Sequence, residues 1–554
     1  MCFSTPSIQF KCFASVILFV GTILTVCIGK TASLNRTEVA HLGAAAYFWK
    51  TGQFDLFHVN PPLGRMIAGI PIILSGPKYD FSNYSPRPQD RSEWKVGMAF
   101  VAANKPQEVR RMVFLGRCML IPIILLGGWF GFLLASEIFG SISGIVFLIL
   151  WSFSPLFLGW GATLCPDMMA ASLGMVAAYA FRRWTNQATW KNALISGLAI
   201  GLLPLAKTTW IVAFGLFPLL WLLSTNRPTW KQGIIVMVLA LYTLNMGYFF
   251  DGSFRLLKDY SFISESLRGD TDNRFAESVL GYIPLPFPAE FVQGIDTQRR
   301  DFEKGLESYL FGQYRRHGWW YYYFVVLSLK EPLGTLLLFI AALLLAIRSK
   351  GYRASWNDEM LVAVPFIVLF AVLCNQTGFS IHPRYLLPAM PFFYLFVSRI
   401  GRVFEFKGRI PKTLVASCLI WTMASSLYVH PYSMSYFNEL VPVRKRPEIL
   451  LGSCIDWGQD AYRLKYWLDK HPEASPIRIE YPCPEKVERI GIENAGSPPS
   501  QPESGWFALG VNDIYADAGH YAWFKKVEPT ATIGYSISIY HVNEVEAERL
   551  QKEK

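Results

Sequence analysis

The feature that most constrains this chain is a series of apolar runs, each about as long as a membrane-spanning helix. A bilayer core about 30 Å thick needs about 20 mainly apolar residues per helix. The first run follows Lys11 and has no convincing cleavage site after Gly29, so we expect a retained anchor and not a signal peptide. The sequence predicts about eleven spans, near residues 12–29, 112–135, 139–158, 167–182, 190–206, 208–224, 232–250, 321–347, 359–375, 384–400 and 411–429.

The composition supports placing most of the chain in lipid. Apolar residues make up 52% of the chain and charged residues 17%, below the roughly 25% charged residues of soluble domains. These values exclude a disordered chain and a conventional soluble enzyme. The net charge of +11 could suggest nucleic acid, but most basic residues lie in short segments between apolar runs, as in membrane topology. We therefore expect no nucleic-acid partner.

The Lys and Arg residues of short loops predict the orientation. With a cytoplasmic N-terminus, the loops near 182–191, 227–231, 348–353 and 399–412 lie inside and are basic. The turns on the other side, around Asp167, Lys207 and His382, are poor in positive charge. This alternation predicts a multi-pass protein of the cytoplasmic (inner) membrane, with its C-terminal domain outside.

Two domains are expected in this polytopic α-helical membrane protein. Residues 1–429 form the membrane domain, with outer loops 30–111 and 251–320, and residues 430–554 form a small extracytoplasmic α/β domain. In the first loop, 38–50 has helical spacing, and 63–75 is apolar but too short to span, so both are expected at the interface. The last segment alternates strand-like pieces (PIRIEY, GWFALGV, YSISIYHV) with one helix near 457–470.

Ionisable residues near the predicted outer helix ends are candidates for function, because charge is costly there. Each also has an ordinary structural explanation, as a helix cap, a snorkelling side chain or a contact to lipid headgroups. The candidates are Glu38 with His41, Asp167, Lys207, and His382 with Arg384.

Together these residues suit an anionic, lipid-linked substrate. Cations at Lys207, Arg384 and Arg65 would neutralise a departing lipid phosphate. A carboxylate, Glu38 or Asp167, would accept the proton of the acceptor as a general base. This scheme requires no metal or other cofactor, and assistance by a divalent cation stays open. In the outer domain, Cys454 and Cys483 could pair in an oxidising compartment.

Several motifs resemble those of a known family. The run TEVAHLGAAAYFWKTGQFDLFHVNPPLGRMIAGIP resembles the first outer loop of the GT-C membrane glycosyltransferases, in particular the protein O-mannosyltransferase (dolichyl-phosphate-mannose-protein mannosyltransferase) and aminoarabinose transferase group. CPDMMAASLGMVAAYAF, GLAIGLLPLAKTT and HPRYLLPAMPFFYLF resemble its second acidic turn, its lysine turn and its His-Pro-Arg-Tyr element, which adds Tyr385 to the candidates. YFNEL and SCIDWGQDAYRLKYWL are similar to bacterial members with a C-terminal outer domain.

The resemblance covers most of residues 10–470 and implies both fold and activity. It implies a GT-C architecture in the membrane domain. It also implies a glycosyltransferase that moves a hexosyl or pentosyl group, with inversion, from a polyprenyl-phosphate sugar to a protein, lipid or glycan acceptor outside the cytoplasm.

One position departs from the family pattern. Members usually carry an Asp-Glu pair in the first loop and use the aspartate as the base, whereas this chain has Thr37-Glu38. Either Glu38 or Asp167 takes that role, or the acceptor chemistry differs, or the chain binds without catalysing. Two other functions stay open: a transporter or flippase for lipid-linked sugars, which the lack of an internal repeat disfavours, and a catalytically silent membrane scaffold.

Overall fold

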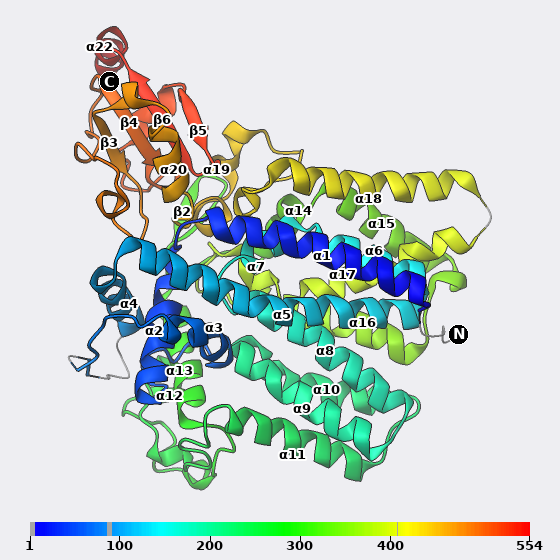
Figure 1. Ribbon diagram of the computed structural model, residues 1–554. Coiled ribbons are helices and arrows are strands. Elements are labelled where there is room, and N and C mark those ends of the chain that lie inside the picture. The colour runs from blue at the N-terminus through cyan, green and yellow to red at the C-terminus, as the bar shows by residue number, and fades with distance from the viewer. Residues whose placement is uncertain (1–5, 83, 86–90, 407, 554) are drawn as a thin grey trace.

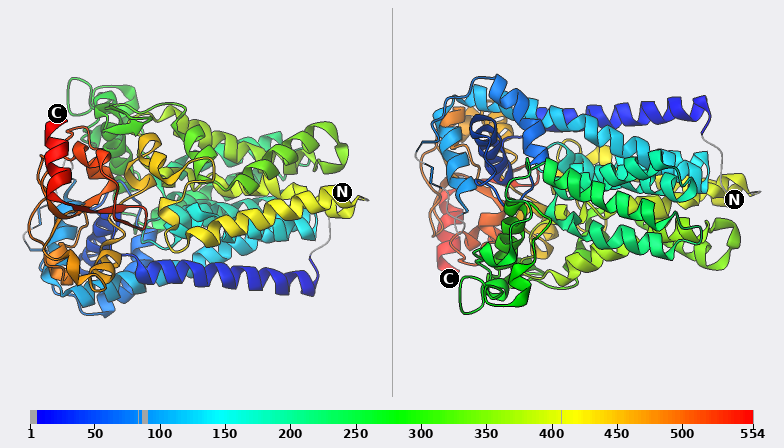
Figure 2. Two further views of the ribbon diagram at one scale, coloured as in Figure 1. Left: turned by 90° about the horizontal axis from the view of Figure 1, so that it is seen from above. Right: turned by 90° about the horizontal axis from the view of Figure 1, so that it is seen from below.

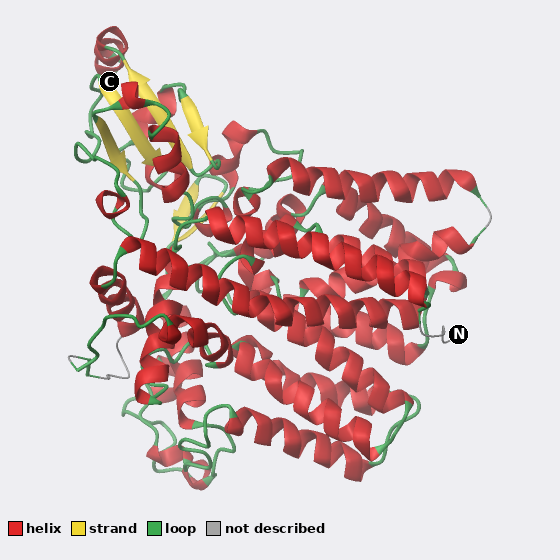
Figure 3. Cartoon of the chain, viewed as in Figure 1, coloured by secondary structure: helices red, strands yellow, loops and turns green. Residues whose placement is uncertain are grey.

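The computed structural model describes residues 6–82, 84–85, 91–406 and 408–553. It is a bundle of roughly parallel helices with a small sheet domain attached at one end (Figure 1). The sheet is confined to the C-terminal region, apart from one short hairpin, and the remainder is helices and loops (Figure 3). We call the end of the bundle next to residues 430–554 the domain end, and the other the opposite end.

Every predicted apolar run lies in a helix or a broken helix, but fewer than eleven of these meet the requirements of a span. Among the described residues, four helices are long and apolar enough to cross a membrane, or six if each bent pair counts as one span. The four are α1 (Ile8–Thr31), α5 (Pro106–Phe139), α16 (Trp356–Asn375) and α18 (Arg409–Val429). The bent pairs are α6 (Ser141–Ser152) with α7 (Pro155–Gly161), and α14 (Tyr322–Lys330) with α15 (Leu333–Arg348).

Each of the other predicted spans fails the length or composition requirement of a membrane-spanning helix. Helix α8 carries two arginines near its end, and α9 and α11 have 17 residues each. The run 208–224 forms the short apolar stretch Thr208–Leu223, and the run 384–400 is divided into a 3-10 turn, a helix of 9 residues and a second 3-10 segment. These elements are α8 (Asp167–Asn186), α9 (Trp190–Ala206), η1 (Thr208–Val212), α10 (Ala213–Leu223), α11 (Trp230–Met246), η5 (Pro383–Leu386), α17 (Met390–Ser398) and η6 (Arg399–Glu405).

Small residues let the helices of the bundle approach closely. A Cβ added to Gly127 on α5 would lie 2.5 Å from the Cα of Ser172 on α8. A Cβ on Gly201 of α9 would lie 2.5 Å from the carbonyl oxygen of Ala240 on α11. Such contacts are typical of helix packing in lipid, where close van der Waals contact replaces the hydrophobic effect.

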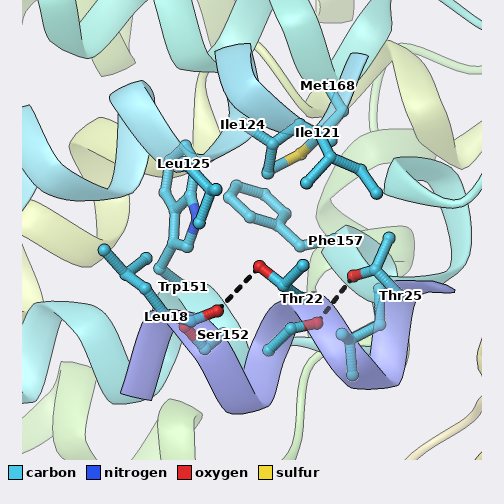
Figure 4. Close-up of a pocket in the computed structure, with 12 residues that line it drawn as sticks. Leu18, Thr22, Thr25, Ile121, Ile124, Leu125, Trp151, Ser152, Phe157 and Met168 are labelled. Carbon is cyan, nitrogen blue, oxygen red and sulfur yellow. Dashed lines mark hydrogen bonds between the residues drawn. The ribbon is translucent and has the colours of Figure 1, made fainter. Parts of the chain in front are cut away.

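The seam between α1 and its neighbours contains hydroxyl groups that are satisfied within the helix. Figure 4 shows Thr22 and Thr25 of α1 beside Trp151 and Phe157, around a small apolar cavity. Thr22 donates to the carbonyl of Leu18 (2.8 Å) and Thr25 to that of Gly21 (2.9 Å). Bonding back along the helix removes the cost of placing these hydroxyls in an apolar seam.

The three segments predicted to lie on one side of the membrane share the domain end (Figures 1 and 2). The first contains the predicted helices at 38–50 and 63–75, as α2 (Arg36–Thr51) and α3 (Leu63–Leu74), followed by α4 (Ser92–Ala103). The second contains α12 (Glu265–Arg268), α13 (Ala289–Lys304), and the hairpin of β1 (Ser308–Leu310) and β2 (Gln313–Arg315).

The C-terminal segment contains the predicted strands and helix in a four-stranded mixed sheet of order β3-β4-β6-β5. Strands β3 and β4 run parallel, with Ile477 opposite Trp506, and the other pairs are antiparallel. Apolar clusters cover both faces of the sheet. The elements are α19 (Arg446–Ile449), α20 (Ala461–Leu468), β3 (Ile477–Glu480), β4 (Gly505–Gly510), α21 (Val511–Ile514), β5 (Ala531–Ile533), β6 (Ile537–Val542) and α22 (Glu544–Lys552).

The suggested Cys454–Cys483 disulfide is not formed. Both thiols are free, because the two side chains face different neighbours. Cys454 is buried against the hydroxyl of Tyr322 (3.3 Å), whereas Cys483 donates to the carbonyl of Glu485 (2.8 Å).

Candidate functional site

Two of the predicted residues meet where helices begin and end at the domain end. Asp167 is the first residue of α8, after the turn that Pro166 closes, and Lys207 directly follows the last residue of α9. The Lys207 ammonium group donates to Oδ1 of Asp167. Both are buried, with exposed fractions of 2% for Asp167 and 6% for Lys207. A buried pair of this kind is costly unless further polar groups or a ligand complete it.

Arg384 brings a second positive charge to the same carboxylate. It lies in η5, and its Nη1 is 4.0 Å from Oδ2 of Asp167. The same nitrogen donates to the Thr37 hydroxyl at 3.0 Å and to the Cys165 sulfur at 3.4 Å. Its Nε is buried and has no hydrogen-bond partner among the described residues. Four segments distant in sequence therefore converge on Asp167, Lys207 and Arg384, which we call the outer cluster.

Aromatic rings line the outer cluster. The Lys207 ammonium lies 4.6 Å from the ring centre of Tyr385, and the Arg384 guanidinium lies 5.4 Å from it. Arg384 also lies 5.3 Å from the ring of Trp160. Rings of this kind stabilise cations that have been taken out of water.

Thr37, the residue before Glu38 in the first loop, is part of this site. Its hydroxyl accepts hydrogen bonds from Arg384 and from the indole N–H of Trp457 (2.7 Å). Trp457 belongs to the segment 453–460 of the C-terminal region, which also pairs its backbone with the start of α2 through Arg36 N–H and the Trp457 carbonyl (3.0 Å). A residue of the C-terminal domain thus reaches the predicted site.

Glu38 has a different environment from Asp167, although both are buried carboxylates. Its Oε1 accepts from Arg117 Nε and from the Leu164 N–H, both at 2.8 Å. Its Oε2 accepts from Arg117 Nη2 (2.6 Å) and from the Asn35 N–H (3.0 Å), which completes the N-terminal cap of α2. Each carboxylate oxygen accepts two hydrogen bonds, so Glu38 links α2, α5 and the turn before α8.

Both predicted histidines border the outer cluster and are neutral. Burial, together with the charges of Arg384 and Arg65, lowers the pKa of His41 to about 3. Its Nε2 is buried without a partner among the described residues. Burial and the nearby cations also hold the pKa of His382 well below its usual range. His382 shares a 2.8 Å hydrogen bond with the Ser453 hydroxyl and packs edge-on against Trp457.

Arg65 is oriented by the backbone of the first loop. It donates to the carbonyls of Phe57 (2.7 Å) and Asn60 (3.0 Å). Its positive charge helps to lower the pKa of His41, but Arg65 makes no direct contact with Asp167 among the described interactions. Arg65 therefore lies at the margin of the outer cluster.

The site combines two fixed cations with one carboxylate that both of them face. Sequence reasoning found Asp167, Lys207, Arg384, His382, Tyr385 and His41, which the structure brings together. It missed Arg117, which is hidden within an apolar run, and Trp457, whose only signal was the IDWGQD motif. Among the described residues, no group of three or more His, Cys, Asp or Glu side chains could hold a metal ion.

Comparison with known proteins gives only distant likenesses. No family model matches the chain, and no curated protein matches it. ArnT from Cupriavidus metallidurans, solved with undecaprenyl phosphate, is similar over 95% of this chain and 97% of its own, with 10% identity and a TM-score of 0.49. The archaeal oligosaccharyltransferase AglB from Archaeoglobus fulgidus, in complex with an inhibitory peptide and a dolichol-phosphate, is similar over 99% of this chain and 78% of its own, with 13% identity and a TM-score of 0.45. Both TM-scores lie below 0.5, so function is inferred from the side chains.

Proposed function

We propose that the chain is a membrane glycosyltransferase that moves a sugar from a polyprenyl-phosphate donor to an acceptor on the outer side of the cytoplasmic membrane. The observation that carries this proposal is the outer cluster, in which Lys207 and Arg384 share the single carboxylate of Asp167. Two buried cations facing one carboxylate leave an excess positive charge. An anionic substrate that brings its own charge would complete the site.

The proposed roles follow from this charge balance. The phosphate of the donor binds Lys207 and Arg384, whose unpartnered Nε offers a further donor. The acceptor oxygen or nitrogen attacks the anomeric carbon as the bond from that carbon to the phosphate oxygen breaks. The phosphate leaves with the bonding electrons, and the two cations neutralise its charge. The resemblance to inverting enzymes supports attack from the opposite face.

Asp167 is proposed as the general base. In the free protein its Oδ1 is paired with Lys207, while its Oδ2 lies 4.0 Å from Arg384, beyond hydrogen-bonding distance. A bound phosphate competes for both cations and weakens their hold on the carboxylate. Loss of a nearby opposite charge raises the basicity of a carboxylate, so donor binding itself prepares Asp167 to accept the proton of the acceptor.

The experiment is transfer from a panel of radiolabelled polyprenyl-phosphate sugars by the purified protein in lipid. Asp167→Asn keeps the shape and removes the base, and it should lower turnover by about 10²–10⁴-fold while donor binding persists. Glu359→Gln is the matched control, since it removes a carboxylate that pairs with Arg399 at the opposite end. Equal turnover in the Asp167→Asn variant and the wild type would refute the assignment.

Binding without transfer is a second candidate, and Thr37 favours it. Thr37 stands where the family has its aspartate, and its hydroxyl is engaged by Arg384 and Trp457. Thr37→Asp would place a carboxylate between these two donors. If the wild type binds donor without turnover and Thr37→Asp turns it over, the natural chain is a silent binder. If the wild type already turns over donor, this candidate fails.

We propose the membrane orientation that the basic short loops of the sequence predict. The basic short loops lie at the opposite end, and the long segments lie at the domain end (Figure 1). An N-terminus in the cytoplasm and a C-terminal domain outside it agree with the preference for positive charge inside. Reaction of single introduced cysteines with an impermeant thiol reagent tests this topology.

A further inference from the structure

A second polar depression lies outside the outer cluster, where the membrane domain meets the C-terminal domain. This headgroup cleft has a volume of about 680 Å³ and lies among the end of α1, the start of α5 and helix α20. Its walls include Arg110, Tyr432, Tyr462 and Arg489. The mechanism proposed above uses none of these residues.

The headgroup cleft continues into a groove along two membrane helices. This tail groove has a volume of about 330 Å³ and shares Gln107, Arg110 and Tyr462 with the cleft. It then follows Val113 and Phe114 of α5 opposite the last turn of α1. Both helices are long and apolar enough to cross a membrane, so the tail groove lies on a seam between spans.

The headgroup cleft holds positive charge that the protein does not neutralise. Arg463 and Lys465 pair with Asp460 and Asp469. Arg110, in contrast, has no carboxylate partner among the described residues and lies 4.6 Å from the ring centre of Tyr462.

Arg489 and Lys30 add to this excess. Arg489 donates to the carbonyl of Val101 (2.9 Å) and to that of Asn104. Its charge acts on Glu485, which accepts from the Tyr462 hydroxyl, but no carboxylate lies within ion-pair distance of it in the described part of the chain. Lys30, exposed at the end of α1, lines the tail groove. Cations at the end of a span, next to a cleft walled by tyrosines, complement an anionic group at the membrane surface.

We propose that the headgroup cleft and the tail groove together bind one anionic phospholipid. Its phosphate lies between Arg110 and Arg489, and the first part of an acyl chain follows Val113 and Phe114 into the bilayer. The junction of a cationic cleft with an apolar seam selects an anionic amphiphile, because a soluble anion would leave the seam empty and a zwitterionic lipid would bring a second positive charge to a cleft that already has an excess of them. This inference goes beyond the proposed transferase activity and does not depend on it.

The position of the groove relates such a lipid to the outer cluster. The tail groove reaches Arg117, which holds Glu38, and Glu38 is adjacent in sequence to Thr37. A lipid bound there contacts Leu34, just before the N-cap of α2, and Arg117, and no residue of the outer cluster lines the groove. Its binding can therefore be measured separately from donor binding.

Native mass spectrometry of the full chain, released from nanodiscs of phosphatidylcholine mixed with phosphatidylglycerol, tests the proposal. The wild type should retain one phosphatidylglycerol in preference to phosphatidylcholine. Arg110→Glu should weaken this retention by about tenfold or more, since each basic residue near the surface contributes about 1 kcal/mol. Arg348→Glu is the matched control, because Arg348 is exposed in the last turn of α15 at the opposite end.

The same experiment contains the outcomes that would overturn the proposal. Equal retention in Arg110→Glu and Arg348→Glu would mean that the cleft holds no lipid. Equal retention of phosphatidylcholine would exclude a site for an anionic headgroup. Displacement by soluble glycerol phosphate or inorganic phosphate at the concentration of the lipid would show a phosphate site in which the tail groove has no part. If Arg110→Glu does not fold, Arg110→Gln serves instead, with an expected loss of about fivefold.

Discussion

The two ends of the helical bundle each contain a buried cluster of charged residues, and the clusters differ in their balance of charge. At the opposite end, Arg182 donates to Glu137 (2.6 Å) and to Asp358 (2.5 Å). Glu137 also accepts from the Tyr179 hydroxyl (3.1 Å), and Asp358 from the Ser355 hydroxyl (2.9 Å). The protein itself thus supplies donors to both carboxylates, in an arrangement that joins α5, α8 and α16.

The outer cluster has the reverse composition, with two cations and one carboxylate. Asp167 is shared by Lys207 and Arg384, and Arg384 keeps an unpartnered buried Nε. Buried polar groups in proteins are usually hydrogen-bonded. An unpaired one needs an explanation, such as a missing ligand. The comparison separates a cluster that joins helices from one that is suited to receive an anion.

The largest expected effect comes from breaking the opposite-end cluster. Arg182→Met would leave Glu137 and Asp358 buried without their shared cation, and breaking such an arrangement costs about 3–5 kcal/mol. We expect the thermal midpoint of the full chain in detergent to fall sharply, with donor turnover per folded molecule unchanged. Arg348→Met, at an exposed site in the last turn of α15, is the control. An unchanged midpoint would mean that the arginine is not needed to join these helices.

A somewhat smaller loss of stability is expected at Glu38. Glu38→Gln removes the charge that pairs with Arg117 and leaves that guanidinium with only carbonyl acceptors and a neutral amide. Loss of one charged hydrogen-bonding partner costs about 2–3 kcal/mol. Thermal unfolding should show this loss, while turnover of the folded fraction stays within about threefold of wild type. Turnover that falls as far as in Asp167→Asn would instead assign the proton transfer to Glu38.

These contrasts also define what could be predicted from sequence. The turns CPD, AKTT and HPR each place an ionisable residue at the end of an apolar run, so the convergence of Asp167, Lys207 and Arg384 followed from topology alone. The helices at 38–50 and 63–75 followed from periodicity and length, and the strands of the C-terminal sheet from alternation.

Other features depended on contacts that no local pattern encodes. Arg117 lies within a long apolar run, and only tertiary structure pairs it with Glu38. The break in the predicted span 321–347 occurs at Glu331-Pro332, where α14 and α15 bend by 112°. The dipeptide was a visible signal, because a proline cannot continue the hydrogen bonding of the preceding helix. Four to six of the eleven predicted spans meet the length and composition requirement among the described residues, and the runs at α9 and α11, with 17 residues each, are too short for that requirement.

A smaller effect is expected from changing the kind of cation in the outer cluster. Arg384→Lys keeps the positive charge but loses the planar set of donors that reaches Thr37 and Cys165. If the guanidinium binds the leaving phosphate, kcat/KM for the donor should fall by about tenfold to thirtyfold, or about 1.4–2 kcal/mol. Arg402→Lys, at the opposite end, controls for a general effect of the exchange. A lysine variant with wild-type kcat/KM would show that Arg384 supplies charge alone.

A third group of acids extends the comparison to the C-terminal domain, where the carboxylate of buried Asp456 lies near that of half-buried Asp513. A Cβ on Gly510 would lie 2.5 Å from Oδ2 of Asp513 and 3.3 Å from Oδ2 of Asp456, and neither oxygen has a hydrogen-bond partner among the described residues. Burial and the neighbouring carboxylates raise the pKa of Asp456 to about 8. Burial and Glu480 raise that of Asp513 to about 7, against the opposing charge of Arg36.

The acids of the C-terminal domain also change how stability depends on pH. Because the pKa of Asp456 is higher in the folded chain than its ordinary value of 3.8, the folded state binds the proton more tightly than the unfolded state. The resulting stability is complete below pH of about 4 and is lost as pH rises through about 8.

Asp456→Asn stays neutral and keeps an oxygen to accept from Gly458 N–H and the Tyr481 hydroxyl. Above pH of about 8 the variant should therefore be more stable than wild type, and the difference should shrink as the pH falls toward about 4. Thermal midpoints across this range measure the effect, with Asp469→Asn at an exposed position as the control. Parallel curves for Asp456→Asn and wild type would mean that folding does not raise the pKa of Asp456, so that the buried carboxylate is compensated in the folded chain.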